Sequence, residues 1–344
     1  MPDDTNPPAR TSLSVLVPVY NEQYLVSTSL SRLEVLADSP HLEDVEVIVV
    51  DDCSTDGTPE ALRRFEEKHS AEGSRIRWRF LRHERNGGKG RAIRTALEQA
   101  SCEISVIHDA DLEYHPKDLL RIVRLFVEEG ADAVFGSRFA GGEARRVLMY
   151  RHQLGNKFLT FLANMVTNLN LTDMETCYKA VRTSLLKSIP LVSRDFRIEP
   201  ELVIKLAKRK ARLFEIPISY SGRTYDEGKK INWRDGFKAL WAIARFAFSD
   251  DIFKKDEYGS QILGRLGRAP RFNAWMADTI RPFCGQRVLE IGSGVGNLTQ
   301  RLIPRRQYVA SDINPLYLQT LQSLREDRPY LEASYCDVTD LASG

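Results

Sequence analysis

Residues 103–116 read EISVIHDADLEYHP, an apolar run with strand character that ends in two aspartates, Asp109 and Asp111. Because side chains alternate along an extended backbone, residues two apart can face the same side of the chain. Two carboxylates are the hard oxygen ligands that Mg²⁺ or Mn²⁺ prefers, and such an ion usually bridges substrate phosphates. We therefore predict a divalent metal on Asp109 and Asp111, against the alternative of a polar turn that merely ends a strand.

Four other short runs share this strand character and alternate with segments of helical period. Val26, Leu30 and Leu33 recur at helical spacing in one such segment, and Ile93 and Leu97 do so in another. This alternation is typical of an α/β domain with a largely parallel sheet covered by helices. The predicted strands are residues 13–19, 45–51, 76–81, 103–109 and 132–136.

Two further polar loops end predicted strands: VPVYNE follows the first and DDCSTDGT the second. In an open parallel sheet, loops at the carboxyl ends of adjacent strands meet in one crevice, so both should join the aspartate loop. Asp51 or Asp52 could accept a hydrogen bond from a base N–H, and Tyr20 could lie against the base. The alternative is that the second loop begins the next helix, with Asp56 or Thr58 as its N-cap. Both readings can hold together.

The composition of the chain bears on which partners it binds and in which cellular compartment it works. With 49 basic and 47 acidic residues, the chain gives no reason to expect a nucleic-acid partner. Its five cysteines are widely spaced without a CxxC pair, which favours a reducing compartment. The first ten residues lack the apolar stretch of a secretory signal, so we expect a cytoplasmic protein. A length of 344 residues favours two domains.

Residues 158–169 and 237–248 have helical period and rows of large apolar side chains, but neither segment is long enough to cross a bilayer. Lys157, Lys238 and Arg245 flank these rows. Apolar rows with flanking cations suit helices that lie in a membrane interface, although core packing is the alternative for both. We therefore expect peripheral docking at the inner face of the membrane.

The polar loops belong to an ordered series of motifs: VPVYNE, DDCSTDGT, NGGKGRA, HDADLEYHP, Gly136-Ser137-Arg138 and TDMETCYK. This series resembles that of dolichyl-phosphate mannose and glucose synthases, which are family-two glycosyltransferases, and it covers residues 13–248. The resemblance implies a GT-A fold, a divalent metal and inverting transfer of a hexose from a GDP- or UDP-sugar to a polyprenyl phosphate; another glycan acceptor is the alternative. It places Asp111 on the metal and the nucleotide on Pro18, Tyr20, Glu22, Asp51, Asp52, Asp109 and Ala110.

Such an acceptor needs fixed cations rather than a general base. A phosphate monoester has a second pKa of about 6, so at neutral pH the lipid phosphate is already largely a dianion. Two anions must then be brought together, which calls for the metal on the diphosphate and cationic side chains on the acceptor. By resemblance, Arg138 and Arg151 grip the acceptor phosphate, although Gly155 stands where some relatives have a serine. The candidate cations are Arg138, Arg151, Arg223 and Lys229.

Three other features accompany these motifs. Lys89 in NGGKG resembles a phosphate cradle, although the spacing of a Walker P-loop is absent. Asp173 in TDMETCYK either orients the acceptor or caps a helix. The polar loop of residues 222–236 is predicted to close over the diphosphate as a lid. The predicted catalytic residues are thus Asp111, Arg138 and Asp173.

A new strand-loop-helix unit begins at Arg287 with RVLEIGSGVGNLTQRL. Its glycines permit close backbone approach to a ligand, and an acidic side chain that ends the next strand can bind ribose hydroxyls. The spacing resembles class I S-adenosylmethionine-dependent methyltransferases and implies ligand contacts by Glu290, Gly292, Gly294, Gly296, Asp312 and Asp337.

About half of such a domain is present, so we expect either that the natural protein is longer or that this unit folds poorly alone, with no methyl transfer by this chain. A bifunctional glycosyltransferase and methyltransferase in the full-length protein is an alternative. The predicted boundaries are a GT-A domain at residues 11–250, a linker at 251–271 and a partial Rossmann-like methyltransferase unit at 272–344.

Overall fold

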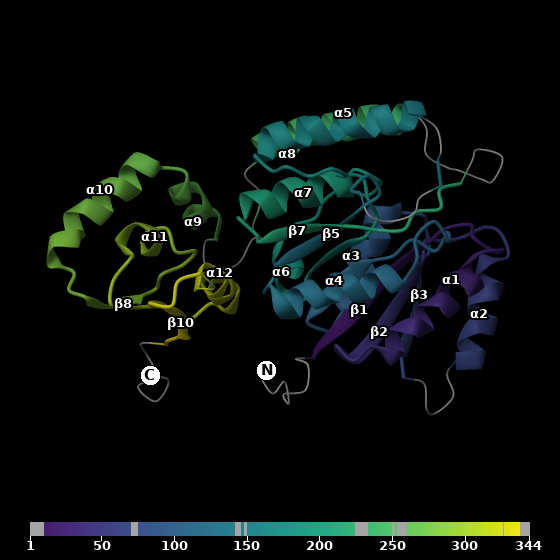
Figure 1. Cartoon of the computed structure of the whole chain (residues 1–344), viewed down its shortest axis with the longest axis horizontal. Helices are drawn as coiled ribbons and strands as arrows, with labels where there is room; N and C mark the ends of the chain where they lie inside the picture. Colours follow the sequence, from purple (N-terminus) through teal and green to yellow (C-terminus); the bar gives the residue numbers. More distant parts are fainter. Residues whose placement is uncertain are drawn as a thin grey trace. The chain divides into compact units, whose positions relative to one another are not determined.

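The computed structural model describes residues 10–69, 75–141, 146–147, 150–223, 233–249, 252, 260–325 and 327–337. Within these ranges the chain forms two compact units (Figure 1). The first unit contains the elements from β1 to α8, and the second contains those from α9 to β10.

A seven-stranded sheet with the order β3-β2-β1-β4-β6-β5-β7 forms the centre of the first unit. All five predicted strands are present: β1 (Thr11–Val19), β2 (Leu42–Asp51), β3 (Arg77–Arg82), β4 (Ile104–Ile107) and β5 (Ala133–Ser137). The sequence analysis missed β6 (Lys179–Arg182), which is antiparallel to β4 and β5, and β7 (Leu213–Pro217), which pairs with β5 in parallel. The predicted α/β class and largely parallel sheet are confirmed.

Apolar helix faces pack against this sheet. α3 (Lys89–Gln99) buries Ile93, Ala96 and Leu97 against β1 and β2, as its predicted stripe requires. α1 (Val26–Arg32) passes directly into the 3₁₀ helix η1 (Leu33–Asp38), so the first stripe spans two elements. The remaining helices beside the sheet are α2 (Thr58–His69), α4 (Lys117–Glu128), α6 (Thr183–Ser188) and α7 (Ile198–Lys208).

α5 (Tyr150–Thr167) and α8 (Trp233–Phe248) pack together above α7 (Figure 1). The predicted apolar row of α8 does not face the core, because Phe237, Trp241 and Phe248 are 65%, 52% and 88% exposed. Its buried face consists instead of Ala239, Ala242, Ile243 and Phe246. Phe158 and Phe161 of α5 are likewise exposed. None of the described helices combines the length and apolarity needed to cross a bilayer.

The second unit has a parallel three-stranded sheet with the order β10-β9-β8. Tyr308, Leu321 and Leu331 belong to its apolar core, whereas Leu289 and Ile291 of β8 stay exposed. The first of its helices lies inside the range that the sequence analysis assigned to a linker. The elements are α9 (Ser260–Gly267), α10 (Pro270–Ile280), η2 (Arg281–Phe283), β8 (Arg287–Ile291), α11 (Thr299–Leu302), β9 (Gln307–Asp312), α12 (Pro315–Arg325) and β10 (Leu331–Tyr335).

Candidate active site

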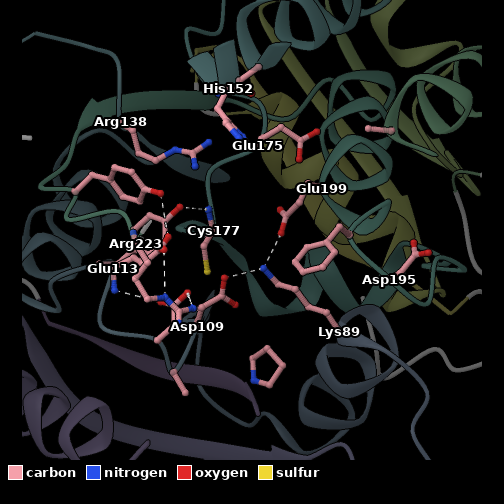
Figure 2. Close-up of a pocket in the computed structure, with 18 of the residues that line it drawn as sticks. Lys89, Asp109, Glu113, Arg138, His152, Glu175, Cys177, Asp195, Glu199 and Arg223 are labelled. Carbon is pink, nitrogen blue, oxygen red and sulfur yellow. Dashed lines mark hydrogen bonds and ion pairs between the residues drawn. The ribbon is translucent and has the colours of Figure 1, made fainter. Parts of the chain in front are cut away.

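A cavity of about 940 Å³ lies where β1, β2, β4 and β5 end at their carboxyl sides (Figure 2). The predicted loops converge there, as expected for an open parallel sheet. Lys229 lies outside the described residues, as does most of the predicted lid. Asp51 and Asp173 do not line the cavity. The predicted residues that do line it are Pro18, Tyr20, Glu22, Asp52, Lys89, Asp109, Ala110, Asp111, Arg138, Arg151 and Arg223.

The backbone is unusual just after three of these strands. Asn21, Cys53 and Leu112 have φ angles of 52°, 61° and 65°, in the left-handed region that non-glycine residues rarely adopt. Each such residue costs about 1 kcal/mol or more and persists only where its surroundings enforce it, a pattern typical of functional loops.

Arg223 sits among three carboxylates of this cavity. Its Nη2 is 3.0 Å from Asp111 Oδ2, its Nε is 3.3 Å from Glu113 Oε1, and its Nη1 is 3.6 Å from Glu22 Oε2. Tyr220 also donates a hydrogen bond of 2.9 Å to Glu113. The predicted role of Arg223 was to bind phosphate, but here its guanidinium ties the ends of β1 and β4 together.

The charge around Asp111 favours a bound cation. Burial and the carboxylates of Asp109 and Glu113 raise the pKa of Asp111 to about 7, although Arg223 opposes this shift. Among the described residues, no group of three or more acidic, His or Cys side chains could hold a metal by itself. Mg²⁺ or Mn²⁺ on Asp109 and Asp111 therefore fits this carboxylate crowding, with its other ligands drawn from phosphates and water.

Lys89 lies between two acidic side chains and is not an open phosphate-binding residue in this conformation. Its Nζ is 2.9 Å from Asp109 Oδ2 and 3.0 Å from Glu199 Oε1 (Figure 2). The second oxygen of Glu199 is 2.6 Å from the buried Nζ of Lys179. Burial alone would raise the pKa of Asp109, but the ammonium of Lys89 lowers it overall. An alternating row of charges thus fixes Asp109.

Asp173 holds Arg138 in place. It is fully buried, and it accepts hydrogen bonds of 2.7 Å and 2.8 Å from Arg138 Nε and Nη2 and one of 2.8 Å from Asn156. The backbone N–H of Arg138 donates a fourth bond to the same carboxylate. Asp173 therefore neither caps a helix nor reaches the cavity as the sequence analysis expected. It is a positioning residue for Arg138, which does line the cavity.

The two aspartates at the end of β2 form hydrogen bonds and ion pairs with the loops around the cavity. Asp52 accepts hydrogen bonds from the N–H groups of Gly87 and Gly88 and contacts His83 Nδ1 at 2.6 Å. Gly88 has a φ of +84°, and a Cβ there would lie 2.4 Å from a carbonyl oxygen. Asp51 accepts a bond from the N–H of Ser54 and pairs with Arg82 at 3.3 Å. Asp51 Oδ2 has no hydrogen-bond partner among the described residues and Asp52 lines the cavity, so the contact of either carboxylate with a base stays a prediction.

Several other cavity residues were given no role by the sequence analysis. Burial and the nearby Glu199 carboxylate raise the pKa of Glu175 to about 7, and its Oε1 has no hydrogen-bond partner among the described residues. Glu175 and His152 lie beside Arg138, opposite Asp109 (Figure 2). Glu113 was detectable in principle, because it continues the two-residue spacing of Asp109 and Asp111.

In the second unit the predicted ligand residues lie around the loop after β8. Gly292, Gly294 and Gly296 have φ angles of 72°, 56° and 77°. Asp312 accepts a hydrogen bond of 2.8 Å from the N–H of Gly294, and Glu290 accepts one of 2.9 Å from Tyr308. Both carboxylates are thus engaged within the unit. Asp337 follows β10 and is partly buried.

Comparison with known proteins agrees with this architecture. Residues 14–189 match the family model described as glycosyl transferase family 2. UDP-N-acetylglucosamine–dolichyl-phosphate N-acetylglucosaminyltransferase of Methanococcus voltae is 25% identical over 240 residues, which is 67% of this chain and 93% of that protein. Dolichol-phosphate mannosyltransferase of Pyrococcus furiosus is 25% identical over 224 residues, which is 63% of this chain and 58% of that protein.

A solved structure of glucosyl-3-phosphoglycerate synthase from Mycobacterium tuberculosis, in complex with Mn²⁺, UDP and glucosyl-3-phosphoglycerate, is also similar. Its TM-score is 0.53 at 19% identity, over 69% of this chain and 80% of that one. The fold is therefore of the GT-A type, with a mostly parallel sheet. With half of its length matched by the family model, this chain belongs to glycosyl transferase family 2 and is a glycosyltransferase.

Proposed function

We propose that this enzyme transfers a hexose, with inversion, from a GDP- or UDP-sugar to a polyprenyl phosphate. The observation that carries the proposal is the division of charge in the cavity. Asp109 lies across the cavity from Arg138, which Asp173 holds in place (Figure 2), and Asp111 also lines the cavity. The names of the two archaeal relatives, both of which are dolichyl-phosphate glycosyltransferases, support the choice of acceptor.

At the donor side, the loops after β1, β2 and β4 would bind the nucleotide diphosphate. Asp109 and Asp111 would hold Mg²⁺ or Mn²⁺, and the similar solved structure contains Mn²⁺ with UDP. When bound, the ion supplies positive charge to the diphosphate that leaves. Lys89 keeps Asp109 ionised and oriented, while Arg223 fixes Asp111 and Glu113 until the donor arrives.

At the acceptor side, Arg138 and Arg151 would bind the phosphate. A phosphate oxygen attacks the anomeric carbon, the new carbon–oxygen bond forms on the face opposite the diphosphate, and the bond to the diphosphate breaks. Because the acceptor is already a dianion at neutral pH, the attack releases no proton. Asp173 and Asn156 keep the guanidinium of Arg138 in its orientation, so little entropy is lost when the phosphate binds.

The exposed rows of α5 and α8 would bring the enzyme to its lipid. Phe158, Phe161, Trp241 and Phe248 present apolar surface to solvent, while Lys238 and Arg245 on α8 match an anionic membrane surface. This supports a peripheral position at the inner face of the membrane, in the cytoplasm.

Transfer of radiolabelled sugar to alternative acceptors tests the proposal. Each GDP- and UDP-sugar is incubated with the full chain and either polyprenyl phosphate, 3-phosphoglycerate or an oligosaccharide. The proposal predicts label in the polyprenyl phosphate alone. Label in either water-soluble acceptor, with none in lipid, would replace it by the alternative of another acceptor.

The glycine loop of the second unit favours a second candidate function there. Three glycines with positive φ follow β8, and an aspartate ends the adjacent parallel β9, an arrangement that suits S-adenosylmethionine in a methyltransferase-like unit. Calorimetric titration of the full chain with S-adenosylmethionine tests this candidate. Binding that Gly292→Val weakens would support it, and absence of binding at millimolar concentrations would reject it.

A further inference from the structure

A second cavity, of about 440 Å³, lies between the loop that follows β3 and the segment that precedes α7. Four of its six lining residues are arginines, and no carboxylate lines it. The lining consists of Arg85, Asn86, Gly87, Arg91, Arg94 and Arg194. The cavity of the candidate active site differs, because both acidic and basic side chains line it.

The four guanidiniums surround one cavity, where their like charges repel one another. Within the described part of the chain, none of them forms an ion pair with a carboxylate. Burial lowers the pKa of Arg94, and the charges of Arg194 and Arg91 act in the same direction, whereas the carboxylates of Glu201 and Glu98 oppose this shift. Concentrated like charge of this kind destabilises the free protein and is relieved when an anion binds.

Two of the arginines have a structural role and two do not. Arg94 donates a hydrogen bond to the carbonyl of Ser193, and Arg91 donates one of 3.4 Å to the carbonyl of Arg85. By contrast, the side chains of Arg85 and Arg194 make no hydrogen bond to any described residue, and both residues are exposed. Local hydrogen bonding therefore explains the positions of Arg91 and Arg94 but not those of Arg85 and Arg194.

We propose that this arginine cavity binds a phosphate group, at a site separate from those of the donor diphosphate and the acceptor phosphate. Planar guanidiniums bind phosphate oxygens through paired, charge-assisted hydrogen bonds, and Arg is preferred for such recognition. Four of them around one small cavity match a group with two negative charges. Asn86 contributes an additional amide.

The phosphate has two possible sources, a soluble phosphorylated compound or the headgroup of an anionic lipid. The surroundings connect the cluster to α8. Arg197, three residues after Arg194, lies with its guanidinium 5.7 Å from the ring centre of the half-exposed Trp241. The segment that carries Arg194 thus also contacts the exposed aromatic row of α8 through Arg197.

The test compares the full-length wild type with Arg85→Gln/Arg194→Gln. A charge-matched control is Arg63→Gln/Arg64→Gln on α2, where both side chains are at least 60% exposed. Inorganic phosphate is titrated against each protein and followed by ³¹P line broadening. In parallel, co-sedimentation is measured with vesicles of phosphatidylcholine, with and without phosphatidylglycerol. Circular dichroism verifies that each variant is folded.

The proposal predicts that Arg85→Gln/Arg194→Gln binds free phosphate or the phosphatidylglycerol vesicles at least about tenfold more weakly than the control, because charge-assisted bonds are the strong ones. Loss in the phosphate titration identifies a soluble source. Loss confined to the phosphatidylglycerol vesicles identifies a lipid headgroup. If the double variant matches both wild type and control in both measurements, the arginine cavity binds no phosphate and the proposal is overturned. Sugar transfer is not the readout, so this result is independent of the proposed reaction.

Discussion

Asp173→Asn should destabilise the first unit and misplace Arg138. Asp173 is fully buried, Arg138 is 15% exposed, and their side chains share bonds of 2.7 Å and 2.8 Å. The amide would keep one acceptor oxygen but would set an NH₂ donor against a guanidinium, leaving its charge uncompensated. Breaking one partner of a buried pair costs about 3 kcal/mol or more. For a unit of this size, that loss lowers Tm by about 6–12 °C.

Urea denaturation followed by circular dichroism measures this loss of stability. Transfer kinetics measured about 10 °C below the Tm of the variant, where it is still folded, test the role of Arg138. KM for the acceptor should rise more than KM for the donor, because only the acceptor side depends on Arg138. Asp195→Asn is the matched control for the stability measurement alone, because Asp195 pairs with Arg197 where both side chains are about one-third exposed. Its effect on stability should stay below about 1 kcal/mol. Equal stability of Asp173→Asn and wild type would refute the reasoning.

Two further predictions concern pH and membrane binding. The pKa of Glu175 is raised from 4.5 to about 7, so the folded protein keeps a proton that the unfolded chain releases, and stability falls as pH rises through this window. Glu175→Gln should remove up to about 3 kcal/mol of that fall, measured by urea titrations on either side of the window; parallel pH curves for both proteins would contradict it. Phe248→Ser should weaken co-sedimentation with anionic vesicles, whereas Phe283→Ser, equally exposed at 88%, should not; equal losses would argue against docking through α8.

The sequence pattern identified five strands of the sheet but not β6 or β7. The strands β1, β2 and β4 are apolar runs, and their pattern is decisive because they are buried in the centre of a parallel sheet. β6 reads KAVR and begins with Lys179, which looks like a surface residue. It is fully buried only because Glu199, twenty residues later on α7, neutralises it. An ion pair formed by the tertiary fold therefore concealed this strand.

The candidate site was predictable where short spacing carries the information. Asp109 and Asp111 follow one strand, and the convergence of the three loops follows from sheet topology. The partners of those residues were not predictable, because Arg138 and Asp173 or Asp111 and Arg223 meet only after the chain has folded. Periodicity likewise identified the helical row of α8 without showing that Trp241 and Phe248 face solvent.

Transfer of label into butanol-extractable lipid, by wild type and by Asp111→Asn, tests the central claim most directly. The assay contains polyprenyl phosphate, Mn²⁺ or Mg²⁺, and each GDP- or UDP-sugar in turn, with the exposed Asp278→Asn as the control substitution. We predict label in the lipid with one donor, loss of that label in Asp111→Asn or on chelation of the metal, and full activity of Asp278→Asn. Lipid labelling that persists in Asp111→Asn, or label released only as free sugar with every donor, would contradict the account.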